Sequence, residues 1–136
     1  LQLIPALYTM FSMFKSSKST PTMTKEFKER LSLEERKQQS ANILTKYPSS
    51  VPVFIDSSSM HKMIDKPRFV IPDGFTIGQL MTSIRARMKM NAATALFVFI
   101  DNQLIPVTSV ISSLYVSHKD EDGYMYVCCS EENTFG

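Results

Sequence analysis

The clearest pattern in the chain is a helical repeat of apolar side chains between residues 77 and 88. The positions that recur every three or four residues are Ile77, Leu80, Met81, Ile84 and Met88. This spacing puts them on one face of an α-helix. Thr76 and Gln79 have the spacing of a capping box, in which two side chains satisfy backbone N–H groups of the first turn. The pattern predicts a helix that packs through this face against a sheet.

Four short apolar runs predict the strands of that sheet, at residues 51–56, 68–72, 95–100 and 124–129. Their β-branched and aromatic content and their flanking turn residues favour strands. We expect the first two runs to pair antiparallel, and Asp101-Asn102 to form a turn after the third. Pro52 lies inside the first run. Because proline has no backbone N–H, Pro52 favours an edge or a bulge there.

Two helices are predicted before the first strand. Residues 24–30 favour a short helix, and Ser32 with Glu35 forms a capping box for a second helix that runs to about Lys46. The proline of Tyr47-Pro48 ends it, because the residue before proline avoids helical angles. The few apolar residues of this helix are Leu33, Ala41, Ile43 and Leu44. We therefore expect it to dock through a narrow apolar stripe.

The order of these elements predicts an α+β fold of the β-grasp class. In this fold a crossover helix packs on a four-stranded mixed sheet, here preceded by the two N-terminal helices. A further short helix is expected at residues 108–118. Its inward-facing side chains would be Val110, Ile111, Leu114 and Tyr115. We assign residues 23–136 to this domain, including the N-terminal helices at 24–46, and residues 1–22 to an extension.

The extension begins with an apolar run, residues 1–14, followed by a polar linker. The run is too short to span a bilayer, is interrupted by Pro5, and lacks the positively charged front of a signal peptide. Three interpretations stay open: a flexible, incidental extension, an arm that touches a membrane or a partner, and a structured element.

Charge and cysteine content narrow the function classes. The formal net charge of +2 is too small to indicate nucleic-acid binding by itself. Cys128 and Cys129 are neighbours and point to opposite faces of a strand, so we expect no disulfide between them and a reducing cytosol. The sequence offers no zinc spacing and no nucleophile–base set, and His61 and His118 are expected at the surface. We therefore expect neither an enzyme nor a metal site.

The last residues form a polar tail that ends on Gly136. The tail has no apolar face and is expected to be mobile. Glycine has no Cβ, so it can enter a slot too narrow for any side chain. These features are typical of a modifier whose own carboxylate is the reacting group.

Several short motifs occur together between residues 27 and 136. They are Lys46-Tyr47-Pro48, Val51-Pro52-Val53, Asp65-Lys66, Arg68-Phe69-Val70-Ile71-Pro72, Thr76-Ile77-Gly78-Gln79-Leu80, Ile84-Arg85-Ala86-Arg87, Ala95-Leu96-Phe97-Val98-Phe99, Lys119-Asp120-Glu121-Asp122-Gly123-Tyr124 and Glu132-Asn133-Thr134-Phe135-Gly136. In this combination the segment closely resembles the ubiquitin-like autophagy modifiers of the GABARAP type, the autophagy-related protein 8 type. It is similar to a plant subgroup of them that ends on a bare glycine. The resemblance covers about four-fifths of the chain and implies a ubiquitin-like β-grasp.

The resemblance implies a modifier that acts in autophagy. In that family an activating enzyme uses ATP to activate the terminal glycine, which is then joined to phosphatidylethanolamine, so no cofactor is expected in the chain itself. Gly136 would be the conjugated residue, and a cysteine protease would recognise Phe135 and Gly136 during processing or delipidation. The expected locations are the cytoplasm, the autophagosome membrane, the vacuole or lysosome, and microtubules. The expected partners are the activating and conjugating enzymes, the protease and cargo receptors, with no nucleic acid.

The resemblance also implies a docking edge at residues 68–71 for receptor peptides with an aromatic-x-x-aliphatic motif, which add a strand to the sheet. The pocket for the aromatic anchor would use Ile43, Pro52, Phe54, Lys66, Val70 and Tyr124. The pocket for the aliphatic anchor would use Phe69, Ile71, Pro72, Phe75, Leu80 and Ile84. The cations that would attract acidic residues beside the motif are Lys66, Arg68 and Arg87. Leu80 and Ile84 are equally consistent with a place in the core.

The chain departs from the family at several places around this edge. Ser49-Ser50 stands where relatives often have a basic residue, and Gln39 replaces a typical acid. Phe54 is larger than the usual aliphatic residue, so we expect a shallower first pocket and a shifted motif preference. Pro67 is expected to remove a backbone donor beside the docking edge. Two other function classes stay open: a modifier conjugated to proteins, and a peptide-binding adaptor that is not conjugated.

Overall fold

The computed structural model describes residues 22–132. The expectations for the extension and for the terminal tail therefore lie outside the described residues. The helices are α2 (Met23–Arg30), α3 (Leu33–Lys46), α4 (Ile77–Met88) and α5 (Ile111–His118). The strands are β1 (Ser50–Asp56), β2 (Arg68–Pro72), β3 (Phe97–Ile100), β4 (Gln103–Leu104) and β5 (Met125–Ser130). No helix within residues 22–132 has the length and apolar character needed to cross a membrane.

The strands form one mixed sheet in the order β2-β1-β5-β3-β4. β1 and β5 are parallel, and every other pair is antiparallel. This confirms the predicted β-grasp with its crossover helix and two preceding helices. The sheet has a fifth strand that the sequence did not reveal. β4 follows the turn at Asp101 and Asn102, both with positive φ, and is only two residues long, too short to show an alternating pattern.

β1 is central in the order of the strands, but the part of it that holds Pro52 is an edge on the β5 side, as expected. The N–H of Ile55 bonds the carbonyl of Pro67 at 2.8 Å, on the β2 side. Because N–H groups alternate sides along a strand, the nitrogen of Pro52 faces the β5 side instead. β5 pairs with β1 only from Val53 onward. The missing N–H of Pro52 therefore falls where β1 has no neighbour to bond.

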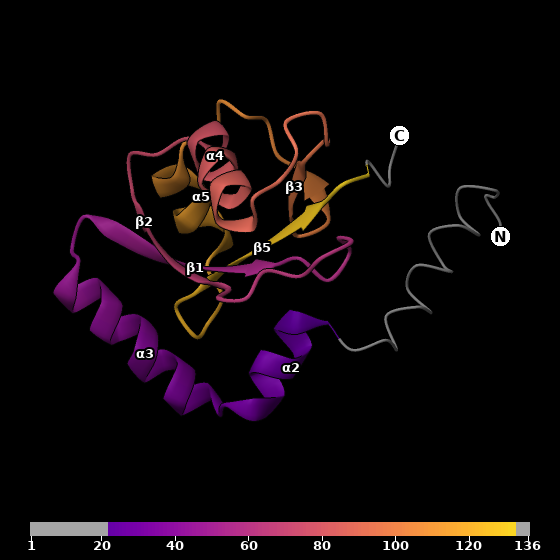
Figure 1. Cartoon of the computed structure of the whole chain (residues 1–136). Helices are drawn as coiled ribbons and strands as arrows, with labels where there is room; N and C mark the ends of the chain where they lie inside the picture. The colour runs from indigo at the N-terminus through magenta and orange to yellow at the C-terminus, as the bar shows by residue number, and fades with distance from the viewer. Residues whose placement is uncertain (1–21, 133–136) are drawn as a thin grey trace, which may run out of the picture.

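Helices cover both faces of the sheet (Figure 1). α4 and α5 lie on one face and bury the main core, to which α4 contributes Ile77, Leu80 and Ile84 at 0% exposure, as its repeat predicts. α2 and α3 lie on the other face over a smaller aromatic cluster of Phe27, Phe54 and Tyr124. On α5 only Ile111 is buried, whereas Val110, which we expected to face inward, is exposed.

The docking of α3 is mainly polar. Of the predicted apolar stripe, Ile43 packs against the cluster of Phe27, Phe54 and Tyr124, whereas Ala41 and Leu44 are exposed. The two buried residues of α3 are Arg36 and Ser40. Arg36 Nη1 lies 2.8 Å from Asp122 Oδ2, and Ser40 Oγ donates to the backbone carbonyl of Asp122. Gly123 follows at φ +91°, and a Cβ built there would lie 2.2 Å from Ser40 Oγ. α3 is thus held against the turn before β5 at a position where only glycine fits.

A buried carboxylate fastens the N-terminal end of α2 to the end of β1. Asp56 Oδ2 accepts the N–H and the hydroxyl of Thr24 at 2.9 and 2.7 Å. Ser58 binds the other oxygen of Asp56 through its N–H and hydroxyl. At the other end of α2, Lys28 Nζ lies 3.0 Å from Asp120 Oδ1. Burial alone would raise the pKa of Asp120, but the hydrogen bonds from Lys28 and from the Asp122 backbone hold it below the usual value.

His118 is not a solitary surface residue as we expected. Its Nδ1 lies 2.7 Å from Asp101 Oδ2, and its ring is partly buried. The contact links the end of α5 to the turn between β3 and β4. His61 is exposed, as expected.

The two cysteines of β5 allow a direct test of which residues of this strand face inward. They form no disulfide; Cys128 is exposed and Cys129 is buried. Burial, with smaller effects of Cys128 and Asp56, raises the pKa of the Cys129 thiol to about 12.

Because the thiolate is the reactive form, we expect a maleimide to add once to the folded chain, at Cys128. Intact mass should show no adduct on Cys128→Ser and an unchanged single adduct on Cys129→Ser; two adducts on the folded wild type would contradict the register.

Candidate functional site: a groove beside the open edge of the sheet

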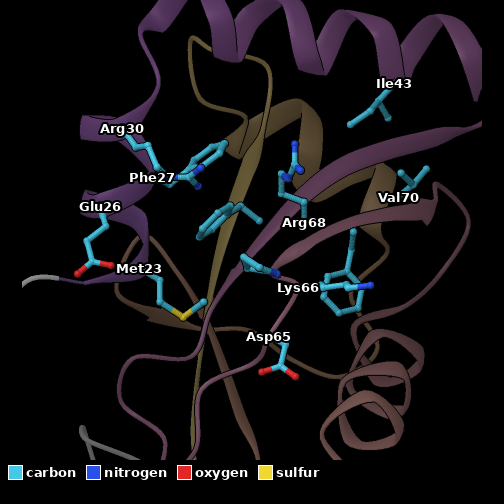
Figure 2. Close-up of a pocket in the computed structure, with 12 residues that line it drawn as sticks. Met23, Glu26, Phe27, Arg30, Ile43, Asp65, Lys66, Arg68 and Val70 are labelled. Atoms are coloured by element: carbon cyan, nitrogen blue, oxygen red, sulfur yellow. The ribbon is translucent and has the colours of Figure 1, made fainter.

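A groove of ≈710 Å³ runs between α2 and the edge strand β2. Figure 2 shows side chains of α2, among them Glu26 and Arg30, on one side and Lys66 and Arg68 on the other. Ile43 of α3 lies over one end, and Val70 of β2 lies below it. The groove thus joins the N-terminal helices to the sheet edge.

The inner wall of the groove is aromatic. Phe27 of α2 stacks on Phe54 of β1 with ring centroids 4.6 Å apart, and it meets Tyr124 edge-on at 5.6 Å. Phe27 and Phe54 are only 3% and 2% exposed. The space above Phe54 is therefore filled by Phe27. An incoming side chain would contact the rims of these two rings and would not enter a deep hole.

A hydrogen-bonded set holds the polar rim in place. Gln39 Oε1 accepts from Arg68 Nη1 at 3.0 Å and from the Tyr124 hydroxyl at 2.9 Å. Burial raises the pKa of the Tyr124 phenol, while the neighbouring Arg68 acts in the opposite direction. Because the amide of Gln39 is neutral, it orients Arg68 without cancelling its charge. Arg68 and Lys66 are both exposed, so the rim on this side is positive.

The outer side of β2 is open for hydrogen bonding. β2 is the first strand of the sheet and pairs only with β1. The bonds from Ile55 N–H to Pro67 O and from Asp73 N–H to Ser49 O show that the odd-numbered residues face β1. Arg68 and Val70 therefore present both N–H and C=O outward. Pro72 has no N–H to present, and its carbonyl accepts the N–H of Phe75 at 3.0 Å in the turn that follows.

This geometry corrects the expected effect of Pro67. Its carbonyl bonds Ile55 of β1, so its nitrogen also faces β1 and takes no donor from the open edge. The proline that shortens the row of outward donors is Pro72. The sequence alone does not show which of two prolines faces outward, because the direction depends on the pairing register.

The structure brings some of the predicted peptide-binding residues together and leaves others apart. Those that line the groove are Ile43, Phe54, Lys66, Arg68, Phe69 and Val70. Pro52 and Tyr124 are buried and do not line the groove. Of the second set, Phe69 and Ile71 are almost fully buried and Leu80 and Ile84 are completely so. Pro72 is exposed and Phe75 is partly buried. The core role of Leu80 and Ile84 is thus the one that their burial supports.

Arg87 of α4 lies at the start of β2. Its guanidinium lies 4.3 Å from the centroid of the Phe69 ring, and its Nη1 donates to the Lys66 carbonyl at 3.0 Å. Arg87 therefore orders the segment that leads into β2 and is the third exposed cation near the edge, beside Lys66 and Arg68.

Sequence reasoning missed the contribution of α2 to the groove. The lining residues that it did not name are Met23, Glu26, Phe27, Arg30, Asp65 and Pro67. An available signal was Phe27, the one aromatic residue in a strongly charged helix. Glu26 and Asp65 add negative charge beside the cations Arg30 and Lys66, so the groove has mixed charge. Within residues 22–132 no three His, Cys, Asp or Glu side chains cluster to hold a metal ion.

Comparison with known proteins identifies the family. The sequence profile described as "Autophagy protein Atg8 ubiquitin like" matches residues 35–136. Autophagy-related protein 8 of Schizosaccharomyces pombe is 41% identical over 117 residues, which cover 84% of this chain and 96% of the relative. The chain belongs to the Atg8 family. Autophagy-related protein 8e of Arabidopsis thaliana is also 41% identical, over 76% of this chain and 86% of the relative.

The three-dimensional comparison agrees with membership of the Atg8 family. The crystal structure of Trypanosoma brucei ATG8 matches with a TM-score of 0.75 and 28% identity, over 81% of this chain and 97% of that chain. The suspected resemblance and the ubiquitin-like fold are therefore confirmed. The family profile begins inside α3, so α2, which forms one side of the groove, lies before the part that the profile matches. This chain is thus a ubiquitin-like protein of autophagy.

Proposed function

We propose that this Atg8-family chain is conjugated through Gly136 to phosphatidylethanolamine on autophagosomal membranes, where it recruits receptors with aromatic-x-x-aliphatic motifs. The observation that carries the recruitment half is the open edge of β2, with outward N–H and C=O groups on Arg68 and Val70 beside the groove. A peptide strand needs such an edge for its backbone and a neighbouring hollow for its side chains. Family membership supports the conjugation half.

In this role the chain supplies the reacting carboxylate and leaves catalysis to its partners. An activating enzyme that uses ATP, a conjugating enzyme and a cysteine protease would act on Phe135 and Gly136. The chain itself would need no cofactor. After conjugation it would reside on autophagosomes and in the vacuole or lysosome, and before conjugation in the cytoplasm, with microtubules as a further location.

Intact mass tests the conjugation half. We expect the chain to gain the mass of one phosphatidylethanolamine after incubation with the lipidation enzymes, ATP and liposomes that contain this lipid. Gly136→Ala should gain none, because the added Cβ blocks a slot that admits only glycine. Gly74→Ala is the matched control, since a Cβ at Gly74 meets no atom within 4 Å. If wild type gains no lipid but still binds receptor peptides, the chain is a non-conjugated adaptor.

Peptide titration tests the recruitment half. An acidic peptide with an aromatic-x-x-aliphatic motif should bind in the micromolar range, about 8 kcal/mol. Val70→Pro removes the outward N–H of Val70. We expect its peptide affinity to be roughly tenfold weaker than that of Val70→Ala, a difference of about 1.4 kcal/mol. The two variants share the lost valine side chain, so their difference isolates the backbone donor. Equal affinities by calorimetry would rule out strand addition at this edge.

A further inference from the structure

A second hollow, which shares no lining residue with the groove of the proposed site, lies where β5 ends. It has a volume of ≈170 Å³, and three methionines line it: Met60 after β1, and Met88 and Met90 at the end of α4. The other lining residues are polar: His61, Lys62, Asn91, Thr94 and Glu131. None of these residues belongs to the docking edge of β2, so the proposed receptor site leaves this hollow unexplained.

The chain is held at the rim of this hollow just before its last residues. Glu131 Oε1 accepts the backbone N–H of His61 at 2.7 Å. Ser130 Oγ accepts the N–H of Glu132 at 3.1 Å and donates to its carbonyl at 2.9 Å, which bends the chain as it leaves β5. The residues that follow thus start from a fixed point next to the methionines.

We propose that Phe135 of the C-terminal tail inserts its ring into this methionine-lined hollow. Phe135 is three residues beyond Glu132, a span of up to about 10 Å at 3.3–3.6 Å per residue. It is therefore within reach of a hollow that begins at Glu131, and it is the single large apolar side chain in residues 133–136.

The size and chemistry of the hollow fit a phenyl ring. An enclosed apolar cavity of about 150 Å³ holds one benzene molecule. This hollow has a similar volume but is open to solvent, so one side of a ring would rest on the three methionines and the other side would stay exposed. Methionine side chains adapt to the shape of a guest, and each sulfur–aromatic contact contributes about 0.3–1.5 kcal/mol.

Docking of Phe135 would have a consequence that rests on the proposed function. The conjugating and processing enzymes would have to lift the ring out of the hollow before Gly136 could enter an active site. Exposure of the tail would then be a step separate from the chemistry.

Methyl NMR of the full chain, labelled at the methionine ε-methyl groups, tests the docking without any lipidation enzyme. A docked ring displaces nearby methyl signals through its ring current. We expect Phe135→Ala to move the signals of Met60, Met88 and Met90. The matched control is Met63, which is 57% exposed on the same loop as Met60 and outside the hollow; its signal should not move.

A second measurement reports the tail directly. Carboxypeptidase digestion followed by intact mass should release the last residues of Met90→Ser several-fold faster than those of wild type, whereas Met63→Ser should match wild type. Circular dichroism should confirm that both variants are folded. Unmoved signals of all three methionines in Phe135→Ala, or equal digestion of the folded Met90→Ser variant and wild type, would overturn the proposal. Neither outcome would affect the intact-mass test of lipid conjugation.

Discussion

Replacing Asp122 with alanine should lower the free energy of unfolding by about 3–5 kcal/mol, the cost of leaving one partner of a buried ion pair alone. The side chains of Arg36 and Asp122 are only 9% and 0% exposed, and their N–O distance is 2.8 Å. Asp122 also accepts the N–H of Tyr124 and the hydroxyl of Tyr126. The substitution therefore leaves a guanidinium, an amide and a phenol without their acceptor. Urea unfolding followed by circular dichroism measures the loss.

Two further variants separate the charge from the hydrogen bonds. Asp122→Asn keeps an oxygen for Tyr124 but still leaves Arg36 uncompensated, so it should remain strongly destabilised. Adding Arg36→Met removes the buried charge and should recover more than half of that loss. Glu121→Ala, at the exposed neighbouring position, should stay within about 0.5 kcal/mol of wild type. A double variant no more stable than Asp122→Asn alone would contradict the ion-pair explanation.

Replacing Phe27 with alanine should cost about 3–5 kcal/mol of unfolding free energy, the usual range for a buried phenylalanine. Phe27 is the one buried residue of α2, and its ring contacts Phe54 and Tyr124. The other attachments of α2 are the partly buried Met23, which packs against both apolar clusters, and polar contacts through Thr24 to Asp56 and through Lys28 to Asp120. Without the ring, α2 loses its one fully buried apolar anchor and the groove loses one wall. Urea unfolding and hydrogen exchange over α2 measure both effects.

Controls on the same helix make this prediction specific. Phe27→Leu keeps most of the apolar volume and should cost clearly less than alanine, since volume-conserving changes are usually below about 1.5 kcal/mol. Glu29→Ala lies at an exposed position of α2 and should change neither stability nor peptide affinity. If Phe27→Ala retains wild-type stability and wild-type exchange protection of α2, the ring does not anchor the helix.

The groove shows how far a local pattern can predict a site. Val70 and Arg68 were predicted at the docking edge, and both lie on the outer side of the edge strand. Leu80 and Ile84 were named both as pocket residues and as core residues, and they are completely buried. Their spacing correctly predicts that they share one face of a helix. Spacing does not show whether that face is covered by the sheet of the same chain or is open to a bound peptide.

The sequence by itself determined the elements with strong local signals. Both predicted capping boxes, Ser32 with Glu35 and Thr76 with Gln79, begin helices. The repeat from Ile77 to Met88 is the core helix, and the apolar runs became strands with shifts of one or two residues at their ends. Caps, helical repeats and turn residues act within a few positions of one another, so they can be read from the chain directly. The family resemblance rests on the same short motifs.

The tertiary structure alone decided how those elements meet. Arg36 and Asp122 are 86 positions apart. The residues around each of them contain no sequence pattern that predicts the buried ion pair through which α3 docks. The place of Pro52 in a central strand and the outward direction of Pro72 depend on where β5 begins to pair and on the register of β1 with β2. The α2 wall of the groove depends on the contact of Phe27 with Phe54. Such pairings are set by packing between distant segments, because burial and register are properties of the whole fold.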